Sequence, residues 1–459
     1  MAQKNIYDMT IGNPTTLLLK FSIPMIIGNI FQQFYNMVDS IIVGQFVGAN
    51  ALAAVGATGS INFLFFSLAF GLSSGIGIIV SQYFGAKDEE RVKKTIATSI
   101  YVVLATSIIM GILMVIAARG VMELLDTPAE IIDDSVLYMQ VVGAGMIAVG
   151  AYNGVSAILR ALGDSKTPLI FLIVACAINI VLDLLFVIGF GWSVFGVALA
   201  TVIAQCSSAI GSILYAWIKM PIFRMARHEY VVDMDILKKS LYIGIPVALQ
   251  NALIAISCVI LQRVVNGFGA TIVAAFTVEN RFEQLVQQPF NSLGAAVSTY
   301  TGQNMGAHNV KRVKQGFWAA TKIAIIFSII MLPIACFGGE AIMRLFTSDV
   351  EVIKQGAIGI RITSFFYSAL GMIYVTRNVL NGAGDVKFAM ISGCVEVIGR
   401  VGLARPLTYI PFIGLLSIWF TTGLTWLFTA VVSCIRYAEG KWKHKGVVSN
   451  VSISKTVEV

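Results

Sequence analysis

Charged side chains are scarce in this chain. Asp, Glu, Lys and Arg make up 12% of its 459 residues, and 57% are hydrophobic, whereas a soluble domain has about 25% charged residues. No soluble fold needs that balance, so the composition indicates a polytopic membrane protein. The 32 basic residues exceed the 24 acidic ones, but they fall in short loops between apolar runs. This placement argues against a nucleic acid partner and for cytoplasmic loops next to membrane lipid.

Residue types and motifs that carry much enzyme chemistry are also few. The six cysteines contain no C-x-x-C pair, and the three histidines all fall in polar loops. A disulfide framework, a cysteine metal site and a histidine proton relay within the membrane are therefore not expected. The sequence has neither a G-x-x-x-x-G-K-[ST] loop, which would indicate ATP-driven transport, nor an H-E-x-x-H motif. We expect a protein that is not an enzyme and has no cofactor.

Twelve apolar runs, separated by Gly, Pro or charged clusters, predict twelve transmembrane helices. The runs cover residues 15–43, 51–81, 93–118, 131–158, 168–190, 194–217, 241–266, 272–302, 314–337, 352–379, 387–410 and 414–437. The loops between them are alternately rich and poor in Lys and Arg. By the positive-inside rule, both termini are predicted to lie in the cytoplasm. The protein itself is predicted to lie in the cell inner membrane.

The chain also repeats itself at a spacing of about 221 residues. Gly163-Asp-Ser-Lys corresponds to Gly384-Asp-Val-Lys, and Pro24 roughly corresponds to Pro246. Each half holds six predicted helices, so both halves enter the membrane in the same direction. This parallel repeat is typical of secondary transporters and predicts two six-helix lobes related by a pseudo-two-fold axis along the membrane normal. The alternative is a duplication within a purely structural helix bundle.

The repeat also predicts local features and domain limits. Thr127–Glu130 and Ser348–Glu351 fit the S/T-x-x-E capping box, each opening the fourth helix of its half. The predicted domains are an N-lobe at 1–217, a cytoplasmic linker at 218–240, a C-lobe at 241–439 and a polar, disordered tail at 440–459.

The first run carries a carboxylate deep within apolar sequence. Asn29, Gln32, Asn36 and Asp39 recur at helical spacing and share one face. A charge at bilayer depth costs about 2.5–3.5 kcal/mol even on the mildest insertion scale, so such an acid usually faces the bundle interior or a water-filled cavity. Pro24, one to two turns before Asn29, removes a backbone hydrogen bond and predicts a kink or hinge in this helix.

A second acid stands in the fifth run, where Asn179 and Asp183 are four residues apart. The sixth run offers Thr201 and Gln205 at the same spacing. Two carboxylates with amide and hydroxyl oxygens suit a small cation, and they equally suit proton uptake, because burial and mutual repulsion favour the protonated form of an acid. The alternative is that each acid only hydrogen-bonds a neighbouring helix.

The second half has a different polar pattern. Glu396 and Arg400 are four residues apart and can neutralise each other on one helix, which favours a structural pair. The eighth run carries a stripe of amides that either lines a cavity or ties helices together. Glu283 stands near the head of that stripe, where it could approach a substrate. The stripe comprises Asn280, Gln284, Gln287, Gln288 and Asn291.

In these residues the chain resembles the MATE (multidrug and toxic compound extrusion) transporters. The resemblance rests on the two six-helix halves, Gln32–Asp39, Ala51–Gly56, Leu159–Asp164 and Asn179–Asp183, and it covers nearly the whole chain. It implies an antiporter that expels small organic cations against an inward flow of H⁺ or Na⁺. In the branch that this chain resembles, the N-lobe cation site uses positions that match Asp39, Asn179, Asp183 and Thr201.

Another branch of that family has carboxylates on the seventh and tenth helices. This chain has no acid in its seventh run or in its tenth, where the charged residues are the basic Lys354, Arg361 and Arg377, so we place coupling in the N-lobe. The four matching positions then form a cation-coupling site that either takes a proton or binds Na⁺. We expect polar residues of both lobes to line the substrate cavity, namely Gln32, Tyr35, Asn36, Gln205, Glu283, Gln284, Gln287 and Asn291.

Other functions remain open at this point. A flippase for lipid-linked precursors, from the same wider superfamily, would favour a cavity ringed with Arg and Lys, whereas the first-half runs hold acids and amides. A channel would need a pore ring in place of two asymmetrical lobes, and an intramembrane enzyme would need a substrate that it turns over. The sequence does not distinguish H⁺ from Na⁺ or name the drug. We expect a monomer in contact with membrane lipid.

Overall fold

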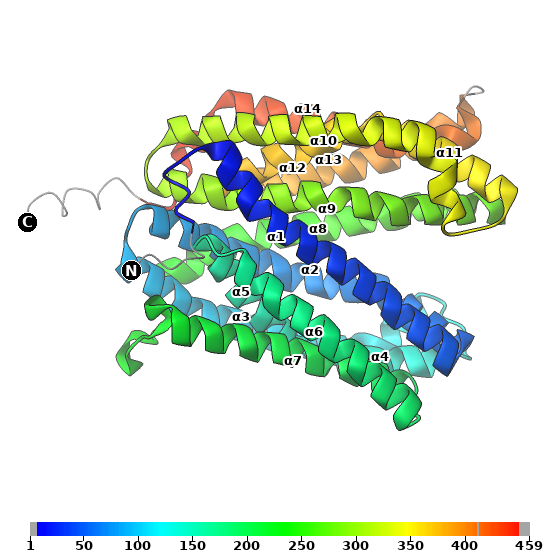
Figure 1. Ribbon diagram of the computed structural model, residues 1–459, viewed down its shortest axis with the longest axis horizontal. Helices are drawn as coiled ribbons and strands as arrows, with labels where there is room; N and C mark the ends of the chain where they lie inside the picture. The colour runs from blue at the N-terminus through cyan, green and yellow to red at the C-terminus, as the bar shows by residue number, and fades with distance from the viewer. Residues whose placement is uncertain (1–6, 411–412, 449–459) are drawn as a thin grey trace, which may run out of the picture. The chain divides into compact units, whose positions relative to one another are not determined.

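The computed structural model describes residues 7–410 and 413–448, and this part of the chain contains helices and no strand (Figure 1). Most of the helices are α-helical; η1 and η2 are π-helical turns, and the other η segments are short 3₁₀-helices. The first half forms α1 (Pro14–Ile42), η1 (Val43–Val47), α2 (Ala49–Gly85), α3 (Glu89–Leu124), α4 (Ile132–Ala144), α5 (Met146–Ala161), α6 (Lys166–Leu184), η2 (Leu185–Gly189) and α7 (Val194–Lys219).

The second half repeats this order of helices. Between the halves lie η3 (Pro221–Phe223) and η4 (Arg227–Glu229). The second half forms α8 (Met234–Asn266), α9 (Ala270–Gly306), α10 (Val310–Arg344), α11 (Val350–Ser364), α12 (Tyr367–Gly382), α13 (Lys387–Ala404), η5 (Pro406–Tyr409), η6 (Gly414–Leu416), α14 (Ser417–Glu439) and η7 (Lys441–His444). Both α2 and α9 contain 37 residues, and both α5 and α12 contain 16.

Backbone details repeat along with the helices. Lys87 and His308 both have positive φ, 58° and 54°, and each precedes the residue that caps the next helix. The side chains of Asp88 and Asn309 accept from the N–H groups three residues later, which starts α3 and α10. The repeat therefore extends from the sequence to the turns that join the helices.

Eight described helices are long and apolar enough to cross a membrane, and two bent pairs also pass when each is taken as one span. The pairs are α4 with α5, bent by 48°, and α11 with α12, bent by 51°. Two further helices complete the twelve spans: α9, which is rich in amide side chains, and α13, which carries Lys387, Glu396 and Arg400. The chain is thus an all-α polytopic membrane protein with twelve membrane-spanning segments, six from each half.

The bends correct the expectation of single helices at 131–158 and 352–379. Gly145 lies at the first break, where a Cβ would stand 2.5 Å from the Val202 side chain on α7. A glycine lets α7 approach the backbone closely at this point. Phe365 and Phe366 occupy the second break, between Ser364 and Tyr367.

Two other local expectations change. The two capping boxes are wrong: α4 has no side-chain cap, and Asp349, rather than Ser348, caps α11 by accepting from the N–H groups of Glu351 and Val352. The helix α1 runs from Pro14 to Ile42 with Pro24 inside it, and the kink or hinge expected there remains a prediction. The tail from residue 440 begins in an ordered form, because η7 follows α14 and Trp442 is buried. The rest of the tail, from residue 449, lies outside the described residues.

The helices form two compact units. The N-terminal unit comprises Ile23–Ala248 with the segment that ends at Asp8, and the C-terminal unit comprises Met9–Ser22 with the chain from Leu249 onward. The domain limits that the repeat predicts, 1–217, 218–240, 241–439 and 440–459, remain a prediction.

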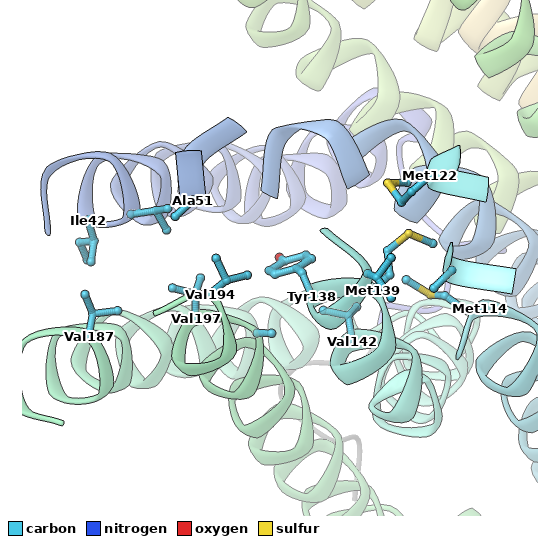
Figure 2. Packing of buried hydrophobic residues seen from close by; sticks show 14 residues of the cluster. Ile42, Ala51, Met114, Met122, Tyr138, Met139, Val142, Val187, Val194 and Val197 are labelled. Atoms are coloured by element: carbon cyan, nitrogen blue, oxygen red, sulfur yellow. The ribbon is translucent and has the colours of Figure 1, made fainter. Parts of the chain in front are cut away.

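The core of the N-terminal unit joins α1, η1, α2, α3, α4, η2 and α7 (Figure 2). Figure 2 shows this cluster running from Ile42 and Val187 at one end to Met114 and Met122 at the other, with Tyr138 between them. Because lipid is as apolar as these side chains, the cluster is held by close van der Waals packing between the helices and not by removal from water.

Two glycines set how closely α3 and α4 pack in this unit. Gly111 on α3 is buried, and a Cβ there would stand 2.6 Å from the Gly143 carbonyl oxygen on α4. The two backbones meet because neither position carries a side chain, which is a common device between membrane helices. This contact holds α4, and with it Tyr138, at a fixed depth in the unit.

Candidate functional site

The ends of α1 and α6 carry the two acids of the N-terminal unit. Asp39 lies four residues before η1, and Asp183 lies two residues before η2. The two π-helical turns pack against each other, and Val43 and Val187 of these turns belong to the core cluster in Figure 2. Both turns stand at the C-terminal ends of their helices, before Gly48 and Phe190. The contact between η1 and η2 brings the two acid-bearing helix ends together.

The carboxyl groups of Asp39 and Asp183 lie within hydrogen-bonding reach of each other. A carboxylate only accepts hydrogen bonds, so a hydrogen bond between the two requires that one of them carries a proton. Asp183 is fully buried and Asp39 is half-buried. Asn179, one turn before Asp183 on α6, is also fully buried.

Three hydroxyl groups complete the cluster. Thr201 on α7 lies within hydrogen-bonding reach of Tyr35 on α1 and of Tyr138 on α4, and both tyrosines are close enough to the two acids to interact with their charge. The Thr201 hydroxyl also donates to the Val197 carbonyl oxygen at 3.1 Å. The cluster therefore draws on α1, α4, α6 and α7, four helices of one unit.

The helices of this cluster contain few basic residues. No Lys or Arg occurs between Lys20 and Lys87, or between Lys166 and Lys219, and α4 contains none. Two carboxylates at membrane depth, on helices with no basic residue beyond Lys20 and Lys166, are costly when both are ionised. A proton shared between them, or a small cation held by their oxygens, would remove that cost.

The oxygen atoms of this cluster suit either a proton or a small cation. Carboxylate, amide and hydroxyl oxygens are ligands for hard cations, and Asp39, Asn179, Asp183 and Thr201 supply all three types. Within the described residues there is no group of three or more His, Cys, Asp or Glu that could hold a metal ion. A transition-metal centre is therefore not indicated by this part of the chain.

The residues expected to line the substrate cavity differ in exposure. In the N-terminal unit, Gln32 and Asn36 are exposed, and Tyr35 and Gln205 are half-buried. The structure brings Tyr35 to the acid cluster, whereas Gln205 lies one turn beyond Thr201 on α7.

Four more of these residues belong to α9 in the C-terminal unit. Glu283 is buried, whereas Gln284 and Asn291 are exposed. Gln287 accepts a hydrogen bond from the Tyr374 hydroxyl at 3.3 Å, so at least this amide of the stripe ties α9 to α12. Whether these residues line one cavity remains a prediction.

The pair predicted in the second half, Glu396 with Arg400, has a third member that the sequence spacing does not reveal. Glu396 forms a close ion pair with Arg377 of α12, and its other oxygen lies 3.9 Å from Arg400. The Ser392 hydroxyl also accepts from Arg377, at 2.9 Å. The pair predicted within α13 is thus the weaker half of a three-residue group that joins α12 to α13.

Tyr138 is the site residue that sequence reasoning missed. It lies on α4, one to two turns after Asp133 and Asp134, in a segment that reads as ordinary apolar helix. Its spacing relative to Asp39 or Asp183 carries no signal, because the contact is between distant parts of the chain.

Several known proteins are similar to this chain in sequence. A family model described as MatE matches residues 24–185 and 246–410, more than half of the chain. The probable multidrug resistance protein YpnP of Bacillus subtilis is 29% identical over 95% of this chain and 98% of its own length. A FAD transporter of Shewanella oneidensis is 23% identical over 80% of this chain and 81% of its own length.

The fold has solved counterparts as well. A structure described as a MOP superfamily transporter from Pyrococcus furiosus matches with a TM-score of 0.89 at 24% identity, covering 96% of this chain and 99% of that one. The chain is therefore a member of the MatE family of membrane transporters.

Proposed function

We propose that this protein is a secondary antiporter that exports small organic cations in exchange for H⁺ or Na⁺ by alternating access. The observation that carries the proposal is the close approach of Asp39 and Asp183 inside one unit, on helices without basic residues beyond Lys20 and Lys166. A pair of this kind changes its charge when a proton or a sodium ion binds.

The proposed cycle couples that change in charge to the cargo. In the outward-facing state, the acids take up H⁺ or Na⁺, which lowers the cost of burying them and weakens their attraction for a cationic drug. The drug leaves, the protein turns inward, and the ion is released to the cytoplasm. Each 100 mV of membrane potential contributes about 2.3 kcal/mol per positive charge moved inward.

The names of relatives support a small-molecule cargo. The relative from Bacillus subtilis is named a probable multidrug resistance protein. Acidic and amide side chains on α1 and α6 suit a cationic drug better than an anionic one. The relative named a FAD transporter carries an anionic cargo by that name, which makes a polyanion the second candidate.

One experiment separates these possibilities. Purified protein is reconstituted into liposomes, and efflux of an ethidium-type dye is followed with a pH gradient or a sodium gradient imposed separately. We expect one of the two gradients to drive efflux against the dye gradient. Efflux that depends on neither gradient would contradict antiport, and transport of FAD or a lipid-linked polyanion in place of the dye would favour the second candidate.

Orientation and assembly complete the proposal. The positive-inside rule places both termini in the cytoplasm, and the protein is proposed to act as a monomer in the cell inner membrane. A Lys445→Cys variant in a cysteine-free background tests the first point. Labelling by an impermeant maleimide should require permeabilised cells, and equal labelling of intact cells would contradict this orientation.

A further inference from the structure

Five charged side chains are buried together in the C-terminal unit, and their charges do not balance. Glu279, Glu283, Glu396 and Arg400 are each less than 7% exposed, and the Arg377 side chain is 11% exposed. Three carboxyl groups therefore face two guanidinium groups. Because Arg is always protonated in proteins, one of the carboxyl groups remains uncompensated.

The contacts show which acids the two arginines serve. Glu396 lies between Arg377 and Arg400, as described above. Arg400 also donates to the Ser257 hydroxyl, lies 3.3 Å from the Cys258 sulfur, and is near enough to Glu283 to interact with its charge. The two arginines thus offset Glu396 and Glu283 and leave Glu279.

Glu279 itself is surrounded by neutral polar groups. Its Oε1 accepts from the Thr363 hydroxyl at 3.2 Å, and the Trp419 indole N–H lies nearby. Trp419 is fully buried, and within the described residues its N–H makes no hydrogen bond of good geometry. An indole N–H is only a donor, so it cannot bind a metal cation. The other acid near Glu279 is Glu283, one turn later on α9.

Two further polar atoms face this pair without a hydrogen bond. The Tyr367 hydroxyl, on a side chain that is fully buried, and Oε1 of Glu283 make no hydrogen bond of good geometry among the described residues, and the Thr363 hydroxyl lies near Tyr367. Tyr367 is close enough to Glu279 and Glu283 to interact with both charges. A buried acceptor without a donor costs about 1–3 kcal/mol, and a hydroxylic proton on Glu279 would supply a donor here.

The remaining titratable groups nearby do not offset Glu279. On α12, Tyr374 interacts with the charge of Glu283 and donates to Gln287. On α11, Arg361 is directed elsewhere: it donates to the Cys336 carbonyl oxygen at 3.0 Å and lies 3.7 Å from Glu340 on α10.

We propose that Glu279 binds one proton and is a second proton-binding site, in the C-terminal unit, separate from the Asp39–Asp183 cluster. The neutral carboxyl group keeps a carbonyl oxygen for Thr363 and directs its O–H towards the unpartnered oxygens of Tyr367 and Glu283. The binding of this proton depends on the C-terminal unit alone, and a role for it in the transport cycle rests on the antiport proposed above.

Infrared difference spectroscopy of the full-length protein in liposomes tests the proposal. The spectrum of wild type minus Glu279→Gln at neutral pH should contain one carbonyl band of a protonated carboxylic acid. A Glu279→Asp variant should keep a shifted band and guards against a loss through misfolding. The matched control is Glu340→Gln, which removes a half-exposed carboxylate paired with Arg361 and should leave the band in place.

Two outcomes would overturn the proposal. A carboxylate signal in place of the acid band would show Glu279 to be ionised, and loss of the band when sodium replaces choline would show a sodium site. Failure of the proposed antiport gives a different result. Dye efflux from the same liposomes would then depend on neither gradient, and the acid band would remain. The band should also persist in an Asp39→Asn, Asp183→Asn double variant.

Discussion

Asp39 on α1 and Asp183 on α6 place their carboxyl groups within hydrogen-bonding reach of each other. The contact depends on two π-helical turns, η1 and η2, which pack together directly after the two acids. A small cation that binds between the acids would therefore connect the two helix ends as well as neutralise charge. The state of this pair thus affects both the charge within the N-terminal unit and the contact between the ends of α1 and α6.

The hydroxyl of Thr201 should tune how tightly this site holds its ion. It lies within reach of Tyr35 and Tyr138. A Thr201→Val variant therefore removes this hydroxyl from the cluster and keeps the shape of the side chain. Loss of one such hydrogen bond is worth about 0.5–1.5 kcal/mol, which predicts a 2- to 12-fold higher ion concentration for half-maximal efflux. Thr106→Val on α3, whose hydroxyl donates only within its own helix, is the control; an equal shift in both variants would count against a role for Thr201.

The glycine contact between α3 and α4 should matter for stability. Gly111→Ala puts a methyl group 2.6 Å from the Gly143 carbonyl oxygen, and overpacking of this kind typically costs about 1–3 kcal/mol in the free energy of unfolding. Gly120→Ala in the same helix meets nothing within 4 Å and should be neutral or stabilising by about 0.5–1 kcal/mol. Thermal unfolding in detergent checks both; a Gly111→Ala variant as stable as Gly120→Ala would show that α3 and α4 can separate freely.

The fold was largely predictable because its signal is local. Apolar runs of bilayer length give the spans, and the repeat at about 221 residues gives their order. Helix ends and breaks were less predictable. The runs 93–118 and 314–337 understate α3 and α10, because charged residues extend both helices beyond the apolar stretch. The bend at Gly145 lies where Val202 of α7, a residue distant in the sequence, approaches the backbone.

The site was predictable in its acids and less so in its partners. A carboxylate such as Asp39 or Asp183 in an apolar run is visible in the sequence because of its cost in a membrane. Tyr138 is an ordinary residue of an apolar helix, and only its position in the fold brings it to Thr201. In the same way, helical spacing pairs Glu396 with Arg400, whereas the closer ion pair comes from Arg377 on another helix.

The N-terminal segment of the C-terminal unit should depend on Arg312. This side chain donates to the carbonyl oxygens of Met9 and Gly12 at 3.2 and 3.0 Å and to the Asn304 amide oxygen at 3.1 Å. Hydrogen bonds from a charged group contribute about 1.5–3 kcal/mol each, so Arg312→Ala should release the segment. Hydrogen–deuterium exchange over residues 9–12 should quicken by about tenfold or more.

The neighbouring Lys311 provides the control for this change, because its side chain is exposed. Lys311→Ala removes the same charge without removing the hydrogen bonds, and exchange over residues 9–12 should match wild type. Unchanged exchange in Arg312→Ala would mean that packing of the fully buried Met9 is sufficient to hold the segment.

The most direct test of the central claim is gradient-driven dye efflux from liposomes that contain Asp39→Asn or Asp183→Asn protein. Each change removes the charge that the ion neutralises while nearly preserving side-chain shape, so each variant should lose efflux by about tenfold or more, equivalent to about 1.4 kcal/mol or more. Glu130→Gln, at an exposed position before α4, should retain it. Efflux at wild-type rates from both Asn variants, with the gradient still required, would contradict the assignment of coupling to this pair.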